Sequence, residues 1–442
     1  MSSYSIFQFL SKESSQNCGY CSGKDSSTSA GMWAHTLTVQ DYQALINRNW
    51  RRSGCYCYKP WMNKTCCPAY MIRCDATAFK LSKHQKKVIK KFNRYMMTGS
   101  ITEPNQDSAK EDSTTETSNP VVSVHKEVTK GVGADPNKPK AMKAKQLRML
   151  KKLEKAGTSN TEANATSSCP SNKSNQGKGL TDLLEEYDSS TAKHKFELRM
   201  VRSYPESATF KETVAEEHLI YQKYQMAVHG DPKSKVDMHQ FRRFLVDSPL
   251  KETSEDGVEL GSFHYQYLLD GQIIAVEVMD VLPECISSKY FFYDPTYDFL
   301  TLGTYSTFRS IYLIQQLHKS LSSLKYYLMG FYIHACPKMK YKAQFSPSYL
   351  LCPESYKWTP IEDCLPQLDI SKYSRLAPPT EQDADRVSED DFNSTCCLHD
   401  RTIYTYNSLK TVRRRSSNED QVKLYTKLVG KTLSTSMLLY MR

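Results

Sequence analysis

Residues 325–342 have the sequence KYYLMGFYIHACPKMKYK, and this stretch carries the strongest indication of the fold. Its first half is aromatic and aliphatic, broken only by Gly330, which predicts a buried β-strand. Its second half follows Cys336-Pro337 and turns basic. Because ligands bind outside the carboxyl ends of strands in open α/β sheets, we interpret the basic half as an anion-handling site. A basic surface loop after an ordinary strand is the alternative.

Strand and helix patterns precede this stretch. Two apolar runs, FHYQYLLD and QIIAVEVMDVLP, are joined by Asp270-Gly271, a dipeptide typical of a short β-hairpin. A further strand ends at Asp294, and residues 306–324 carry apolar side chains on one helical face. The order hairpin, strand, long helix, strand predicts an α/β (α+β) fold.

Composition sets broad limits on the 442-residue chain. The net charge is +11 and there are 29 tyrosines, which suits binding to nucleic acid. Residues 98–190 are rich in Ser, Thr, Asn, Lys, Glu and Pro, which predicts a disordered linker. The N-terminus does not have the pattern of a signal peptide, and no run of about 18 apolar residues predicts a membrane span. We therefore expect a reducing compartment.

Seven of the 14 cysteines precede residue 75. Cys18 and Cys21 form a C-x-x-C pair, a spacing that lets two thiolates reach one metal centre. The adjacent pair Cys66-Cys67 could complete the site, and clustered cysteines in a reducing compartment indicate metal ligands before disulfides. Free, partly buried thiols are the alternative reading, and three more cysteines are nearby as reserve ligands: Cys55, Cys57 and Cys74.

Basic residues alternate with aromatic residues in the stretch NWRRSGCYCYKP. Arg51, Arg52 and Lys59 stand there beside tyrosines, a pattern that suits phosphate contacts and base stacking. Residues 82–95 predict a basic amphipathic helix that could add to the same surface. Solvated basic turns and faces are the alternative.

Together these stretches resemble the eukaryotic arginyl-tRNA–protein transferases. The N-terminal resemblance lies in NCGYC, NWRRSGCYCYKP and TCCPAYMIRC. The C-terminal resemblance lies in SFHYQYLLDGQIIAVEVMDVLP, YFFYDPTYDFLTLGTYS, GFYIHACPKMKYKAQFSPSYLLCP and WTPIEDCLP. Cys55 and Cys57 enrich a cysteine count that the family does not require there, so they put in doubt only which cysteines bind the metal.

The resemblance implies transfer of arginine from arginyl-tRNA to the α-amino group of proteins that begin with Asp, Glu or oxidised Cys. The product would carry an N-degron for ubiquitin-dependent degradation, and we expect a monomer in the cytoplasm and nucleus. It also implies an iron–sulfur ([4Fe–4S]) or zinc site on Cys18, Cys21, Cys66 and Cys67.

The resemblance further implies how the chain is divided. Residues 1–97 form a Cys-rich domain and residues 98–190 the linker. Residues 191–376 form a catalytic domain similar to the N-acetyltransferase fold. Residues 377–442 add a polar segment and a C-terminal helix that completes the catalytic domain.

The reaction itself needs a proton acceptor. The acyl donor is an ester and already activated, so this step requires no ATP. The neutral α-amine attacks, and a carboxylate or imidazole could take its proton. Our catalytic candidates are Asp294, His334 and Tyr305. A turn-capping role for Asp294 and a core position for His334 are the alternatives.

Substrate recognition needs cations and backbone N–H groups. The candidates for the acidic acceptor side chain lie in the basic half of residues 325–342 and in the Cys-rich region: Lys338, Lys340, Tyr341, Lys342 and Arg73. Gly303 and Ser306 open the long helix, where free N–H groups could hold the tRNA terminal phosphate or the oxyanion. A structural Arg73 and a plain N-cap at Ser306 are the alternatives.

Two other functions compete with this interpretation. A CoA-dependent N-acetyltransferase on the same fold would favour a Q/R-x-x-G-x-G/A loop at the start of the long helix, where LGTYSTFR lacks the second glycine. A non-enzymatic adaptor that binds metal and RNA would need no acceptor pocket.

Overall fold

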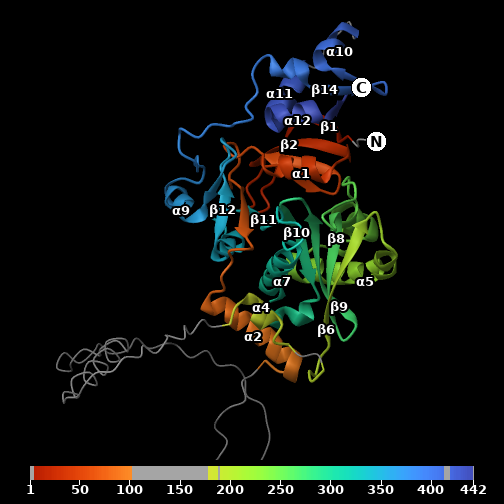
Figure 1. Cartoon of the computed structure of the whole chain (residues 1–442), viewed down its shortest axis with the longest axis vertical. Coiled ribbons are helices and arrows are strands. Elements are labelled where there is room, and N and C mark those ends of the chain that lie inside the picture. The colour runs from red at the N-terminus through yellow and green to blue at the C-terminus, as the bar shows by residue number, and fades with distance from the viewer. Residues whose placement is uncertain (1–3, 102–177, 188–189, 413–418, 442) are drawn as a thin grey trace, which may run out of the picture. The chain divides into compact units, whose positions relative to one another are not determined.

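Two β-sheets organise the protein in the computed structural model, which describes residues 4–101, 178–187, 190–412 and 419–441 (Figure 1). These residues belong to one unit, and the predicted mixed α/β class is confirmed. Most of the predicted linker, including its basic helix near residue 150, lies outside the described residues. No helix in the described ranges combines the length and apolar character needed to cross a membrane.

The larger sheet, which we call the central sheet, contains the opening stretch as an inner strand. Its strands, in spatial order, are β13 (Trp358–Pro360), β12 (Ser348–Leu351), β5 (Tyr70–Asp75), β11 (Tyr326–Tyr332), β10 (Cys285–Tyr293), β9 (Gln272–Val281), β8 (Val258–Leu269) and β6 (Phe196–Tyr204), with β7 (Thr253–Glu255) beside β8. Every residue of β11 except Tyr326 is buried, as its composition predicts. Strand β5 comes from the Cys-rich region and inserts between β12 and β11.

The predicted hairpin is confirmed as β8 and β9. Asp270 and Gly271 both have positive φ, +52° and +85°, the combination that a two-residue type I′ turn requires. Strands β10 and β11 are parallel neighbours, but they pair only from Cys285↔Tyr326 to Ser287↔Leu328. Beyond these three residue pairs the two strands part.

The smaller sheet joins the two ends of the chain (Figure 1). Its strands, in spatial order, are β15 (Thr402–Thr405), β14 (Cys396–His399), β16 (Leu438–Tyr440), β1 (Ile6–Gln16), β2 (Ser27–Thr36), β4 (Tyr56–Pro60) and β3 (Arg51–Ser53). The C-terminal segment therefore adds strands to the sheet of β1. Gly430, with φ +90°, ends the predicted C-terminal helix α11 (Glu419–Val429).

The helices begin at the polar caps that the sequence offers. Thr38 caps α1 (Val39–Ile46), and Ser82 forms a capping box at α2 (Lys83–Thr98). Helix α7 (Leu302–Leu317) crosses from β10 to β11, and its Tyr305 ring stacks on Phe92 of α2 at 3.7 Å between centroids.

The remaining helices are short or cover single faces. They are α4 (Leu180–Leu184), α5 (Ala208–Tyr224), η1 (Gln225–His229), η2 (Lys233–Lys235), α6 (Met238–Phe241), η3 (Arg242–Val246), η4 (Pro295–Leu300), α8 (Pro337–Lys340), η5 (Tyr341–Gln344), α9 (Ile361–Ile370), η6 (Asp391–Ser394), α10 (Tyr406–Val412) and α12 (Lys431–Ser436). Helix α4 falls within the residues predicted as linker, and its three leucines are buried, so this part of the linker prediction is wrong.

Two neighbouring arginines of β3 tie the smaller sheet to the central sheet. The Arg52 side chain is fully buried, and its Nη2 lies 2.5 Å from Oδ1 of Asp280 in β9. Arg51 donates from Nη1 to Ser287 Oγ and from Nη2 to Ser288 O, each at 2.8 Å. Burial acts to raise the pKa of Asp280, but the charges of Arg52 and Lys289 and the hydrogen bonds from Arg52 and Ser262 together hold that pKa below its ordinary value.

We predict that Arg52→Met destabilises the fold by about 3–5 kcal/mol, because the substitution leaves Asp280 buried without its partner. Urea denaturation measures the change in the free energy of unfolding. The control Arg199→Met removes an exposed arginine of β6 and should change the free energy by no more than about 0.5 kcal/mol. Equal effects of the two substitutions would contradict the assignment of Arg52 as a tie between the sheets.

Candidate active site and metal centre

The four predicted metal ligands converge. Cys18 and Cys21 lie in the loop between β1 and β2, and Cys66 and Cys67 lie in the segment that passes from β4 to β5. The four Sγ atoms all lie within 4.8 Å of one another. The remaining described cysteines are not part of this group, so the structure selects these four over the reserve ligands.

Local backbone geometry shapes this cysteine cluster. The Cys18 N–H donates to Gly23 O at 2.8 Å and the Cys66 N–H donates to Ser26 O at 2.9 Å, so both cysteine loops are held. A side chain at Gly23 would begin 2.4 Å from Ser26 Oγ, too close for any Cβ. A backbone hydrogen bond at Gly23, and then hydrogen bonds from Cys66, lower the pKa of Cys21 to about 7. Thiolate is the form that binds a metal.

Four thiolates are the donor set of structural zinc sites and of iron–sulfur clusters. The residues present therefore fit a bound metal of either kind. Because the cluster sits where the chain leaves the smaller sheet for the central sheet, a metal there would hold the β1–β2 loop against this crossing.

A basic centre lies where β10 and β11 part. Arg51 reaches this point beside Gly330 of β11, where a Cβ would be in ordinary van der Waals contact with Arg51 Nη2, at 3.7 Å. Lys342 donates from Nζ to Phe331 O at 2.8 Å and is half-buried. Burial first, and the Arg51 charge second, lower the pKa of Lys342 to about 7. Lys342 is thus partly neutral at physiological pH.

Tyr20 stands between Cys18 and Cys21 in sequence, and the residue is 45% exposed. Burial around its hydroxyl, and then the nearby Tyr58 and Cys18, raise the pKa of Tyr20 to about 12, whereas the Arg51 charge acts to lower it.

Arg73 of β5 is held in an aromatic sandwich. Its guanidinium carbon lies 3.6 Å from the centroid of Tyr326 and 4.2 Å from that of Trp358. Burial lowers the pKa of Arg73, and its Nε has no hydrogen-bond partner. Burial raises the pKa of the Cys285 thiol, and the charges of Arg73 and Arg51 both act to lower that pKa. The two guanidinium groups therefore both lie in the neighbourhood of Cys285.

The other lysines of the opening stretch point outward. Lys338, Lys340 and Tyr341 are exposed, whereas Lys342 is half-buried and hydrogen-bonded. Of the three lysines, the structure therefore brings only Lys342 to the basic centre.

Two predicted proton acceptors already have partners. Asp294 caps η4 by accepting from Thr296 N at 3.0 Å, and its other oxygen accepts from Lys223 Nζ at 2.7 Å. His334 contacts the Tyr332 hydroxyl at 2.7 Å and Asp369 Oδ1 at 2.8 Å. These contacts agree with the turn-capping alternative for Asp294 and give His334 structural partners on both ring nitrogens.

The start of α7 differs from the prediction. Tyr305 is fully buried between Phe92 and Arg309 and cannot touch a substrate, so its catalytic assignment is wrong. Ser306 is not the N-cap: the helix begins at Leu302 after Thr301, and Ser306 Oγ donates to Gly303 O at 3.0 Å inside the first turn. Gly303 is exposed at the helix start, as expected.

The predicted tRNA contacts at Arg51, Arg52 and Lys59 need correction. Their exposed fractions are 5%, 3% and 7%, and each donates hydrogen bonds inside the protein. The basic and aromatic pattern of this stretch therefore marks inter-sheet contacts and not an exposed phosphate-binding surface. Helix α2, in contrast, keeps exposed lysines on its outer face.

Sequence reasoning missed Glu277, a fully buried carboxylate of β9. It accepts from Ser310 Oγ at 2.6 Å and from the Tyr327 hydroxyl at 2.7 Å. Burial raises the pKa of Glu277 despite these donors. An acidic residue within the apolar run QIIAVEVMDV was the available signal.

Comparison with known proteins gives matches in both halves of the chain. A family model described as "Arginine-tRNA-protein transferase, N terminus" matches residues 16–87, and one described as "Arginine-tRNA-protein transferase, C terminus" matches residues 216–352. Arginyl-tRNA–protein transferase 1 of Drosophila melanogaster is 38% identical over 486 residues, covering 99% of this chain and 99% of that protein. The chain belongs to the arginyl-tRNA–protein transferase family.

More distant relatives agree with this assignment. Arginyl-tRNA–protein transferase 2 of Arabidopsis thaliana is 33% identical over 81% of this chain and 76% of its own length. An aspartate/glutamate leucyltransferase of Pseudomonas fluorescens is 35% identical over 32% of this chain and 54% of its own length. The predicted family is confirmed, and membership in a family of enzymes disfavours the non-enzymatic adaptor.

We predict that Cys67→Ser lowers the metal content of the purified transferase by roughly half or more, because three thiolates leave one coordination position open. Elemental analysis of anaerobically purified protein provides the measurement. Cys55→Ser, outside the cluster, is the matched control and should leave the metal content unchanged. Equal metal content in both variants would exclude the cysteine cluster as the binding site.

Proposed function

We propose that this chain transfers arginine from arginyl-tRNA to the N-terminal amino group of proteins that begin with Asp, Glu or oxidised Cys. The modified proteins would then enter ubiquitin-dependent degradation, in the cytoplasm and nucleus. The observation that best supports this proposal is the full-length similarity to a protein named arginyl-tRNA–protein transferase. The missing second glycine in LGTYSTFR favours this proposal over CoA-dependent acetylation, and the basic centre supplies groups that the transfer step needs.

The parting of β10 and β11 supports an N-acetyltransferase-like catalytic domain. Parallel pairing of β10 and β11 ends at Ser287↔Leu328. At the next residue of β10, the Ser288 carbonyl accepts a hydrogen bond from Arg51 in place of a strand partner on β11. We assign the reacting end of arginyl-tRNA to this point. The exposed Gly303 N–H at the start of α7 remains our candidate for the terminal phosphate.

The transfer step follows from the chemistry of an ester and an amine. The acceptor nitrogen forms a bond to the ester carbonyl carbon, and the bond from that carbon to the ribose oxygen breaks. The nitrogen loses a proton and the ribose oxygen gains one. We assign proton removal to Lys342, because it is half-buried with a pKa near 7, whereas Asp294 and His334 are tied to neighbouring residues.

Arg73 is our candidate for the acceptor carboxylate. Tyr326 and Trp358 hold its guanidinium in one plane, and this preorganisation favours bidentate binding of a carboxylate. Lys338 and Lys340 are exposed and remain candidates for more distant parts of the acceptor. The tRNA body would contact the exposed lysines of α2 through its phosphates.

The cysteine cluster is proposed to hold a zinc ion or a [4Fe–4S] cluster on Cys18, Cys21, Cys66 and Cys67. Either group would cross-link the two cysteine loops. The metal is assigned a structural role, and the transfer step uses only protein groups.

The direct test is incorporation of radiolabelled arginine from charged tRNA into peptides that begin with Asp, Glu or Ala. We expect the Asp and Glu peptides to be labelled and the Ala peptide to remain unlabelled. Labelling from acetyl-CoA instead would favour the N-acetyltransferase alternative. Absence of any arginine incorporation, with and without oxygen, would overturn the proposed function.

We predict that Lys342→Met slows single-turnover transfer by about 10²-fold, the lower end expected for loss of a proton acceptor. In the unmodified enzyme the rate should rise with pH through about 7, because Lys342 accepts a proton only when neutral. The variant should keep only the dependence due to the acceptor amine, near about pH 8.

Lys340→Met is the matched control, since Lys340 is exposed on the same segment. It should keep both the rate and the pH profile. A Lys342→Met variant that retained the rise through pH 7 would exclude Lys342 as the proton acceptor.

A further inference from the structure

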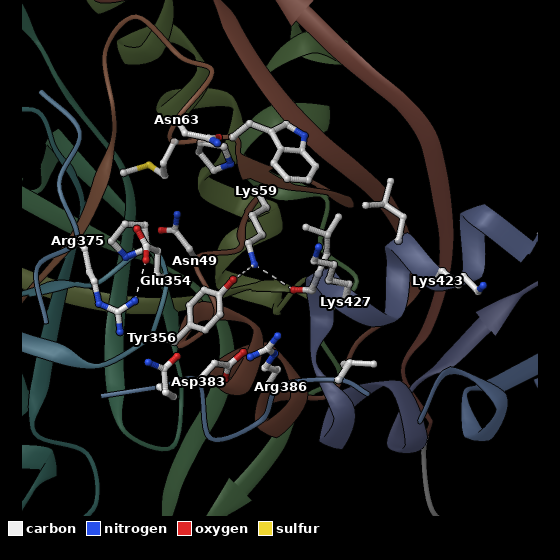
Figure 2. Close-up of a pocket in the computed structure, with 18 of the residues that line it drawn as sticks. Asn49, Lys59, Asn63, Glu354, Tyr356, Arg375, Asp383, Arg386, Lys423 and Lys427 are labelled. Atoms are coloured by element: carbon white, nitrogen blue, oxygen red, sulfur yellow. Dashed lines mark hydrogen bonds and ion pairs between the residues drawn. The ribbon is translucent and has the colours of Figure 1, made fainter. Parts of the chain in front are cut away.

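A pocket of about 660 Å³ lies away from the basic centre (Figure 2). Segments distant in sequence line it: Asn49, the end of β4 with the loop that follows, the loop between β12 and β13, residues 373–392, and α11. The C-terminal segment thus builds one wall. None of the functions proposed above uses this pocket.

Lys59 lies at the base of the pocket and is 7% exposed. Its Nζ donates to the Tyr356 hydroxyl at 2.8 Å and to Leu428 O at 3.1 Å (Figure 2). No carboxylate in the described part of the chain forms an ion pair with it. Burial first, and the nearby Arg48 second, hold the pKa of Lys59 well below its ordinary value. A bound carboxylate would favour the protonated form of Lys59, whose ammonium has three donors, so one donor would be left for the ligand.

Arg386 and Lys427 on the rim also have no ion-pair partner among the described residues, and both are exposed. The carboxylates of the pocket, in contrast, are already paired. Asp383 lies 2.9 Å from Arg48, and Glu354 lies 2.7 Å from Arg375. The unpaired charge in the pocket is therefore positive, and an anionic group would be attracted to it.

Apolar side chains lie between these charges. They include Trp61, Met62, Phe392 and Leu424. Alternating apolar walls and cations suit a short peptide with an acidic side chain. A continuous phosphate backbone suits them less, because it offers no apolar side chain to cover Trp61 and Phe392.

We propose that this pocket binds an acidic, partly apolar segment of a polypeptide, with a side-chain carboxylate on Lys59 and its apolar neighbours against Trp61 and Phe392. The site is distinct from the proposed reaction centre. Lys59 and Tyr58 are consecutive in β4, so their side chains lie on opposite faces of the smaller sheet. Tyr58 packs against Phe331 on the side of the reaction centre.

The test is calorimetric titration of the full chain with acetyl-Glu-Leu-Glu-Phe-amide and with its Gln-for-Glu counterpart. These peptides have no free amine, so they cannot accept arginine. We expect the acidic peptide to bind at least about tenfold more tightly, a difference of about 1.4 kcal/mol. Equal binding of the two peptides would overturn the proposal.

Charge-reversal variants distinguish binding in the pocket from non-specific electrostatic attraction of the acidic peptide. Arg386→Glu combined with Lys427→Glu changes only exposed rim residues and should abolish the preference for the acidic peptide. Lys211→Glu combined with Lys251→Glu makes the same change in net charge at exposed positions outside the pocket lining, and should preserve it. Lys59→Met should weaken binding as the rim variant does.

RNA is the competing occupant. A rim variant that loses tRNA affinity, while the acidic peptide binds neither protein, would overturn the proposal in favour of an RNA contact. Arginine transfer to an Asp-starting peptide is measured in parallel as a separate readout. Failure of transfer would count against the proposed function, and failure of the acetylated peptide to bind would count against this site alone.

Discussion

The contacts of Arg51 and Arg52 with the central sheet are the constraint on which the rest of the structure depends. The Arg52 side chain is fully buried and paired with Asp280. Arg51 donates a hydrogen bond to the Ser288 carbonyl at the point where β10 no longer pairs with β11. Because a buried charge is stable only with its partner, these contacts fix the smaller sheet against β9 and β10. The loop that carries Cys18 and Cys21 connects β1 and β2 of this smaller sheet.

This arrangement concentrates positive charge where the central sheet opens. Arg51, Arg73 and Lys342 come from three different segments, and the neighbouring cation and burial together lower the pKa of Lys342 to about 7. The same environment that disfavours a charged lysine makes a neutral amine available near physiological pH. Arg51 therefore links the packing of the two sheets to the proposed proton acceptor, Lys342.

Local patterns predicted much of the fold correctly. The Asp270-Gly271 turn requires positive φ at two successive residues, so the hairpin could be recognised from the dipeptide alone. The capped helix α2 and the buried strand β11 follow equally from short-range chemistry and from burial of apolar side chains. The convergence of the two cysteine pairs was also predicted from their spacing, because clustered cysteines in a reducing compartment indicate metal ligands before disulfides.

The sequence by itself determined the family, the mixed α/β class and the four cysteines that meet, since each depends on residue identity or short spacing. Only the tertiary structure decided the environment of each charge. Arg52 and Lys59 were predicted as surface cations but are buried, and Tyr305 is a core residue. Of the three lysines at 338, 340 and 342, only Lys342 turns inward. The C-terminal strand joins β1 across the whole length of the chain. Burial and long-range strand pairing depend on contacts between distant segments, and these leave no local pattern in the sequence.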